Sequence, residues 1–165
     1  MKKILMFMLV TAIIATSACA QQPQASPPAK VSGKAGNANI TISYSQPSVK
    51  GRVVFGDLVP YGKVWRTGAN EATVFETDSD IMVEGKKLAV GKYALFTIPG
   101  EKSWTIIFNK TWNQWGSFKY KEEDDVLKVE VKPQSAPMTE MMTFSIANNK
   151  VKLMWEKTAV EFSVK

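Results

Sequence analysis

The residues best suited to chemistry lie in one short stretch, YGKVWRTGANEAT, residues 61–73. This stretch holds an indole, a guanidinium, an amide and a carboxylate. Arg66 is one of only two arginines in a chain that otherwise uses lysine, and a planar guanidinium forks onto a carboxylate in a way that an ammonium cannot. These residue types predict recognition of a small polar ligand, and the candidate binding residues are Trp65, Arg66, Asn70 and Glu71.

The same residues also have a structural interpretation, which we favour. Arg66 would pair with Glu71 or Asp57 and fix the segment, because an arginine beside apolar neighbours is most often a satisfied group. Trp65 would pack beneath the segment, and Asn70 would bond its backbone as a turn residue. The irregular connection from Gly56 to Glu71 contains this stretch, and a structureless connection of that length is typical of a binding loop or of a packed Ω-loop.

A second irregular segment reads NKTWNQWGSF, residues 109–118. Its candidate binding residues are Trp112, Asn113, Gln114 and Trp115, because two indoles with amides between them can stack on a sugar ring and bond its hydroxyls. The competing interpretation, which we favour, is that the two tryptophans plug an open end of the fold.

Catalysis has few residue types to draw on. The chain has no histidine, and Cys19 is its only cysteine, which excludes nucleophiles activated by histidine and the usual zinc and copper sites. We therefore name no catalytic residue, no cofactor and no metal ligand. The acidic residues 122–125 lack the spacing of a calcium loop and are predicted to form a solvated turn. The alternative function is a hydrolase with Glu71 and either Asp57 or Glu76 as general acid and base.

The beginning of the chain reads as an export signal. Residues 1–20 carry two lysines, a short apolar stretch and a cleavage zone of small residues. Ordinary cleavage would leave Gln21 first, whereas a lipobox would leave a lipidated Cys19, and both alternatives stay open. Residues 21–34, rich in proline, glutamine and serine, are predicted to be a flexible linker before one domain, residues 35–165. We expect this domain in the periplasm, secreted, or anchored to a membrane by lipid.

The charge of the chain is basic but diffuse. Removal of residues 1–20 takes away Lys2 and Lys3 and no acid, so the formal charge falls from +6 to +4. Nucleic-acid binding needs basic residues concentrated on one face, usually with arginine. We therefore expect no nucleic-acid partner, and we expect membrane contact only through lipid at Cys19.

Alternation of apolar and polar residues predicts an all-β fold, a single antiparallel β-sandwich. Gly91 and Tyr93 suit a turn followed by a tyrosine corner. The predicted strands cover residues 39–45, 73–77, 81–84, 93–98, 104–108, 125–132, 141–147, 151–156 and 160–165.

Three stretches together resemble a known family. They are VPYGKVWRTGANEAT (59–73), GKYALFTIPGEKSWTIIFN (91–109) and WNQWGSFKY (112–120), and they are similar to exported bacterial proteins grouped as domain of unknown function 2911. The resemblance covers residues 34–164. It implies an all-β exported domain and no established activity, substrate or catalytic residue. The hallmark run that it implies is Trp65, Arg66, Gly68, Asn70 and Glu71.

From these observations we expect a non-enzymatic envelope domain. It would bind a small polar or glycan ligand, or another envelope protein, through the two irregular segments. The hydrolase of a sugar or cell-wall fragment is the alternative.

Overall fold

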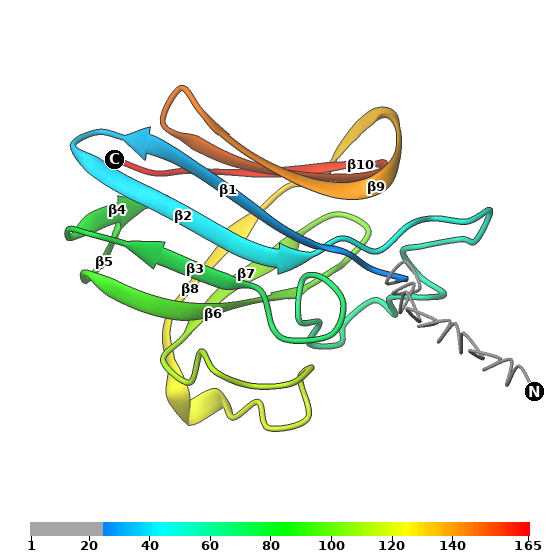
Figure 1. Cartoon of the computed structure of the whole chain (residues 1–165), viewed down its shortest axis with the longest axis horizontal. Helices are drawn as coiled ribbons and strands as arrows, with labels where there is room; N and C mark the ends of the chain where they lie inside the picture. Colours follow the sequence, from blue (N-terminus) through cyan, green and yellow to red (C-terminus); the bar gives the residue numbers. More distant parts are fainter. Residues whose placement is uncertain (1–24) are drawn as a thin grey trace, which may run out of the picture.

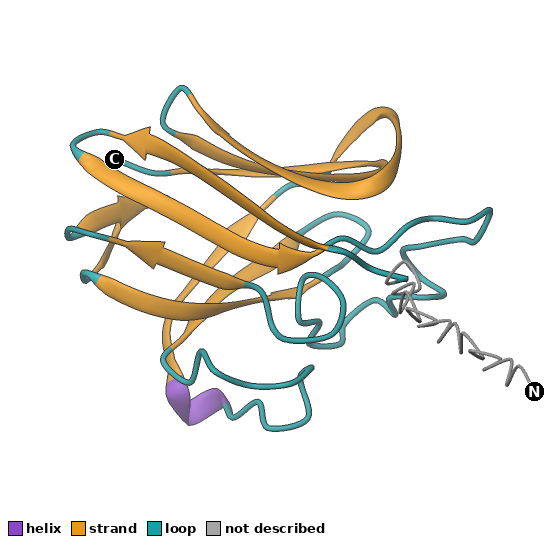
Figure 2. Cartoon of the chain, in the orientation of Figure 1, coloured by secondary structure: helices purple, strands orange, loops and turns teal. Residues whose placement is uncertain are grey.

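The computed structural model describes residues 25–165. The predicted signal peptide, Cys19 and the first part of the predicted linker lie outside these residues. The described chain is built from ten strands and one short 3-10 helix (Figure 2). Their bounds are β1 Pro28–Ala35, β2 Ala38–Ser45, β3 Val74–Thr77, β4 Ile81–Val83, β5 Lys86–Leu88, β6 Gly91–Ile98, β7 Trp104–Asn109, η1 Glu122–Asp124, β8 Asp125–Val131, β9 Gln134–Ala147 and β10 Lys150–Ser163.

The strands form two layers, as the alternating pattern predicts (Figure 1). One layer is a six-stranded antiparallel sheet in the order β1-β2-β3-β6-β7-β8. The other contains the β9-β10 hairpin and the short β4-β5 hairpin. The two hairpins are joined where the Met82 N–H bonds the Lys165 carbonyl at 2.7 Å and the Lys165 N–H bonds the Met82 carbonyl at 2.9 Å. The predicted all-β class and sandwich architecture agree with this arrangement.

β10 reverses its direction near Glu156, which has a positive φ of 54° (Figure 1). The end of the strand therefore returns beside its beginning. The Val164 N–H bonds the Asn149 carbonyl at 2.8 Å, and Lys150 pairs with Glu161 at 2.7 Å. The two strands predicted for residues 151–156 and 160–165 correspond to the two arms of this bend.

The core lies between the layers. Ile40 and Ile42 of β2 are fully buried, whereas Thr41 between them is not, as a half-buried strand requires. β6 and β7 are buried on both faces. The tyrosine corner predicted at Tyr93 is confirmed, since its hydroxyl donates to the Ala89 carbonyl at 2.9 Å. No helix in residues 25–165 is long and apolar enough to cross a membrane.

The structure differs from the sequence prediction at the linker. Residues 28–34, assigned to a flexible spacer, belong to β1, which pairs with β2 from Pro28 opposite Ser45 to Ala35 opposite Ala38. β1 is an edge strand, and proline is tolerated at the first residue of such a strand. The sequence pattern did not predict β1, because its side chains are mostly small and polar. An edge strand needs less apolar surface than a central one.

A glycine of β1 shows how closely this strand packs on β9. A Cβ atom added at Gly33 would lie 2.8 Å from both Cβ and Cγ2 of Ile146. We expect Gly33→Ala to lower the free energy of unfolding by about 1–3 kcal/mol through overpacking, measured by urea unfolding. Lys34→Ala, at an exposed position of the same strand, is the control. If both substitutions have the same small effect, β1 does not lie against β9 in this way.

Candidate functional site

The 28-residue connection between β2 and β3, residues 46–73, is a packed loop. Four of its own apolar residues are buried: Val49, Val54, Phe55 and Val59. The Trp65 N–H bonds the Thr97 carbonyl of β6 at 2.8 Å, and the Thr97 N–H bonds the Trp65 carbonyl at 2.9 Å. The loop is therefore held to the six-stranded sheet at the beginning of the hallmark run.

The run from Trp65 to Thr73 is closed by its own hydrogen bonds. The Trp65 indole donates to the Gly68 carbonyl at 3.1 Å, and the Thr73 hydroxyl donates to the Thr67 carbonyl at 2.7 Å. A Cβ atom at Gly68 would lie 3.0 Å from that hydroxyl, so glycine suits the position. Much of the signature is therefore a requirement of the fold.

Thr67 holds a strained backbone conformation inside this run. Its φ is 54°, a region that β-branched residues rarely occupy. The residue is buried, and its hydroxyl contacts the Thr97 hydroxyl at 3.1 Å. Such strain persists only where the surroundings determine the conformation, and it is often found at functional sites. Here the strained residue is the immediate neighbour of Arg66.

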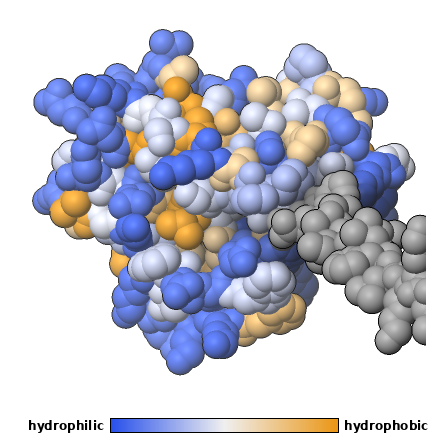
Figure 3. All heavy atoms as spheres, in the orientation of Figure 1, coloured by the Kyte–Doolittle hydropathy of each residue, from blue (hydrophilic) through white to orange (hydrophobic). Residues whose placement is uncertain are grey.

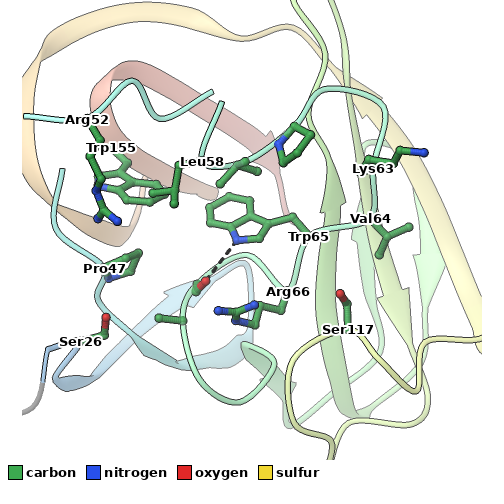
Figure 4. Close-up of a pocket in the computed structure, with 14 residues that line it drawn as sticks. Ser26, Pro47, Arg52, Leu58, Lys63, Val64, Trp65, Arg66, Ser117 and Trp155 are labelled. Carbon is green, nitrogen blue, oxygen red and sulfur yellow. Dashed lines mark hydrogen bonds between the residues drawn. The ribbon is translucent and has the colours of Figure 1, made fainter. Parts of the chain in front are cut away.

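A cavity of about 360 Å³ lies against the loop (Figure 4). The two arginines of the chain, Arg52 and Arg66, both line it, together with Lys63. None of its lining residues is acidic. Its apolar wall includes Leu58, Val64, Trp65 and Trp155. The cavity thus combines positive charge with aromatic and aliphatic surface.

Figure 4 shows the guanidinium of Arg66 directed into this space. Among residues 25–165, Arg66 forms no ion pair, and its Nε is buried without an acceptor. Burial lowers the pKa of this guanidinium below its ordinary value. The indole N–H of Trp155 is likewise buried without a partner in the described chain. Two residues that line one cavity therefore carry donors that the described chain leaves unused.

Arg52 reaches the same cavity from the other side, next to Trp155 (Figure 4). Its Nε donates to the Val49 carbonyl at 3.0 Å and its Nη2 to the Ser48 carbonyl at 2.6 Å. These bonds fix the guanidinium at the rim. The sequence analysis missed Arg52 and Lys63 as site residues, although the scarcity of arginine was a usable signal for Arg52.

The predicted pairing of Arg66 with an acid is wrong for the described chain. Glu71 is exposed, and its backbone bridges to Trp115; Asp57 is exposed and does not line the cavity. Asn70, with a φ of 59°, turns the chain between Arg66 and Glu71. The Glu71 side chain lines a separate depression, so the hallmark run does not converge on one site.

Two further expectations for the run have mixed outcomes. Trp65 does pack beneath the loop: it is buried and stacks on Trp155 with ring centroids 5.8 Å apart. Asn70 does not bond the loop's own backbone through its side chain. Its amide donates at 3.3 Å to the Ser26 carbonyl and to the Ser45 hydroxyl, and so ties the loop to the β1-β2 edge.

The structure brings the two irregular segments together. The Ala72 N–H bonds the Gln114 carbonyl at 3.0 Å, and the Gly116 N–H bonds the Asn70 carbonyl at 3.0 Å. Ser117 lines the arginine cavity. The second segment therefore lies at the edge of the site that the first one builds.

The interpretation that both tryptophans plug the end of the sandwich is wrong. Trp112 is 40% exposed and Trp115 is 58% exposed. Asn113 is exposed as well, whereas Gln114 is buried and donates to the Thr111 carbonyl. The ammonium of Lys92 lies 5.5 Å from the ring centre of Trp112. Trp115 is thus the more open of the two candidate stacking surfaces.

The acidic turn also holds a buried group. Glu122 and Glu123 are exposed, as predicted, but the side chain of Asp125 is only 4% exposed. It accepts hydrogen bonds from Asn109 at 2.8 Å and from Tyr120 at 2.5 Å. Burial, and secondarily the bond to Asp125, raises the pKa of Tyr120 well above its ordinary value. This network supports the second segment.

The acids named for a hydrolase are not gathered at the cavity. Glu76 pairs with Lys92 at 3.3 Å, and neither Glu76, Glu71 nor Asp57 lines it. Within residues 25–165 no cluster of three or more histidine, cysteine, aspartate or glutamate side chains is arranged to hold a metal ion.

The comparisons with known proteins are limited to one finding. A family model described as "Protein of unknown function (DUF2911)" matches residues 26–164. Searches of curated proteins and of solved structures found no match.

Proposed function

The chain belongs to the family of unknown function DUF2911, and from the geometry of its cavity we propose that it is a non-enzymatic binding module for a small ligand with an anionic group and an apolar body. The anionic group binds Arg66, with Arg52 at the rim. We further propose, from the predicted leader, that binding takes place outside the cytoplasm.

The observation that carries this proposal is the unpaired guanidinium. Arg66 is half-buried and its Nε is buried without an acceptor. Removing a cation or a polar donor from water is unfavourable unless something compensates it, and no acidic residue lines the cavity around Arg66. A carboxylate, sulfonate or phosphate offers at least two oxygens in the geometry that a guanidinium grips. A ligand of this kind would supply the missing charge.

The apolar wall defines the rest of the ligand. Leu58, Trp65 and Trp155 line the cavity beside the two arginines, and its volume of about 360 Å³ is within the range of sites for small molecules. An indole face favours a flat ring. We propose binding rather than hydrolysis because the lining residues include no carboxylate to act as general acid or base.

The test uses residues 21–165, which contain every described strand. Anilinonaphthalene sulfonate is the anionic aromatic probe, and N-phenylnaphthylamine is its uncharged counterpart. We expect Arg66→Gln to weaken sulfonate binding about 10- to 100-fold, as for loss of a charged hydrogen bond, and to leave the neutral probe unchanged. Arg66→Lys should restore only part of the affinity, because lysine lacks the fork.

Two controls accompany this titration. Lys119→Gln removes an exposed charge and should leave both probes unaffected. Arg66→Gln should change the free energy of unfolding by less than about 1 kcal/mol, because it breaks no ion pair of the described chain. Equal sulfonate affinity for the unsubstituted protein and Arg66→Gln would contradict the proposal, as would a large loss of stability in that variant.

A further inference from the structure

Exposed apolar side chains lie on or next to the segments that line the arginine cavity. Five of them, named here the apolar rim, come from three different segments. They are Val53 (60% exposed), Leu58 (41%), Trp115 (58%), Phe118 (86%) and Met141 (37%). Isolated exposed apolar residues are ordinary, but apolar residues grouped at one place indicate an interaction surface.

Contacts in the structure connect the rim residues. Met141 follows Glu140, and its backbone bridges to Ser48, whose carbonyl accepts from Arg52. Val53 is the next residue after Arg52. Both Arg52 and Leu58 line the cavity. Trp115 and Phe118 flank Ser117, which lines the same cavity. Each rim residue therefore belongs to, or is bonded to, a segment that lines this cavity, and Leu58 lines the cavity itself.

The described chain also begins at this place. Ser26 lines the cavity and accepts a hydrogen bond from Asn70, whose own carbonyl binds Gly116 of the aromatic segment. Figure 1 shows this beginning, the 46–64 part of the loop and the bend of β9 at one end of the molecule. The seven steps between consecutive Cα atoms from Cys19 to Ser26 span at most about 25 Å. Any attachment at Cys19 thus holds the rim close to a membrane.

Basic residues outnumber acidic residues around the rim. Lys50, Arg52, Lys63 and Lys119 are exposed near its members. The nearby acids are Asp57, Glu140 and Glu71; Glu140 accepts a hydrogen bond from the Lys50 backbone, and the backbone of Glu71 bridges to Trp115. Figure 3 shows moderately hydrophobic residues among hydrophilic ones at this end. Basic and aromatic residues together are the composition of surfaces that lie on anionic bilayers.

We propose that the apolar rim docks onto the surface of an anionic phospholipid bilayer. Trp115 and Phe118 enter the interfacial layer, where aromatic rings are favoured, and the lysines and Arg52 face the lipid phosphates. This contact is made by the folded domain itself and does not require lipid at Cys19. Trp115 and Phe118 are not among the residues that line the cavity, so their contact with a bilayer can be tested separately from the cavity ligand.

The experiment measures co-sedimentation of residues 21–165, which lack both the predicted signal and Cys19, with vesicles of phosphatidylglycerol and phosphatidylcholine. We expect binding, and we expect the double variant Trp115→Ser/Phe118→Ser to reduce the partition coefficient about tenfold or more, since two interfacial aromatics are lost. The matched control is Met82→Ser/Val90→Ser, which removes exposed apolar residues that lie outside the rim (41% and 55% exposed). This control should bind as the unsubstituted protein does.

Two further arms distinguish other partners. Binding should fall with added salt and with replacement of phosphatidylglycerol by phosphatidylcholine. The proposal is overturned if the unsubstituted domain does not bind vesicles. It is also overturned if both double variants lose vesicle binding to the same extent. Binding to oligosaccharides without vesicle binding would assign the rim to a glycan and reject the bilayer. Loss of probe binding by Arg66→Gln with unchanged vesicle binding would show that the two sites are separate.

Discussion

Trp155→Ala is expected to lower the free energy of unfolding by about 3–5 kcal/mol, the usual effect of truncating a buried aromatic side chain. Trp155 is 1% exposed. It stacks on Trp65 at 5.8 Å and meets the edge of Phe55 at 5.9 Å. Since domains of this size are stable by about 5–15 kcal/mol, the loss is a large part of the total. Urea unfolding followed by circular dichroism measures it.

Trp155→Phe separates packing from the polar group. This variant keeps a ring against Trp65 and removes the indole N–H, which is buried without a partner in the described chain. We expect a loss of about 1–2 kcal/mol, less than for alanine, because most of the volume is conserved. An alanine variant as stable as the phenylalanine variant would show that the packing of Trp155 against Trp65 and Phe55 does not support the loop.

Asp125→Ala is expected to be comparably severe, with a loss of about 3–5 kcal/mol. The carboxylate of Asp125 is almost fully buried and also pairs with Lys128 at 3.0 Å. Its removal leaves the hydroxyl of Tyr120 without its acceptor. The amide of Asn109, which is 0% exposed, also loses one acceptor and keeps only its bond to the Lys121 carbonyl at 3.0 Å. Buried donors that lose their partner carry the full penalty of desolvation. Thermal and urea unfolding measure the effect.

Two companion variants sharpen this prediction. Asp125→Asn retains one acceptor oxygen, so an intermediate loss of about 1–3 kcal/mol is expected. Glu123→Ala removes an exposed acid of the same turn and should change stability by less than about 1 kcal/mol. If Asp125→Ala behaves like Glu123→Ala, the carboxylate is solvated in solution and the network is not a support of the second segment.

The strands could be predicted because their alternation records which face each residue turns to the core. β2 and β8 follow this rule closely, and β6 and β7 are recognisable as continuous apolar runs. β1 was not predicted because its alternate residues Lys30, Ser32 and Lys34 are polar. Only its pairing with β2 gives this segment order. Pairing is a relation between segments, and the composition of one segment does not contain it.

The site could be predicted only in its parts. The sequence marks Arg66 and Trp65 as unusual, but it does not say which of two possible partners a guanidinium finds. The left-handed turn at Asn70 carries Glu71 away from Arg66, and that turn depends on contacts with Ser26 and Ser45. Arg52 reaches the cavity from the beginning of the same loop, and Trp155 reaches it from β10, which is distant in sequence. Which residues meet at the cavity depends on the fold, so no local sequence pattern predicts it.

The pair of backbone hydrogen bonds between Lys165 and Met82 has a consequence for the order of folding. The β4-β5 hairpin is joined to the second layer through residues 163–165, which leave the ribosome after all other described residues. The sandwich therefore closes only when nearly the whole chain is available, and partial chains expose the inner face of the first sheet. If the chain is exported, as its first residues predict, we expect this late closure to keep it competent for translocation and to require holding chaperones until residues 163–165 are available.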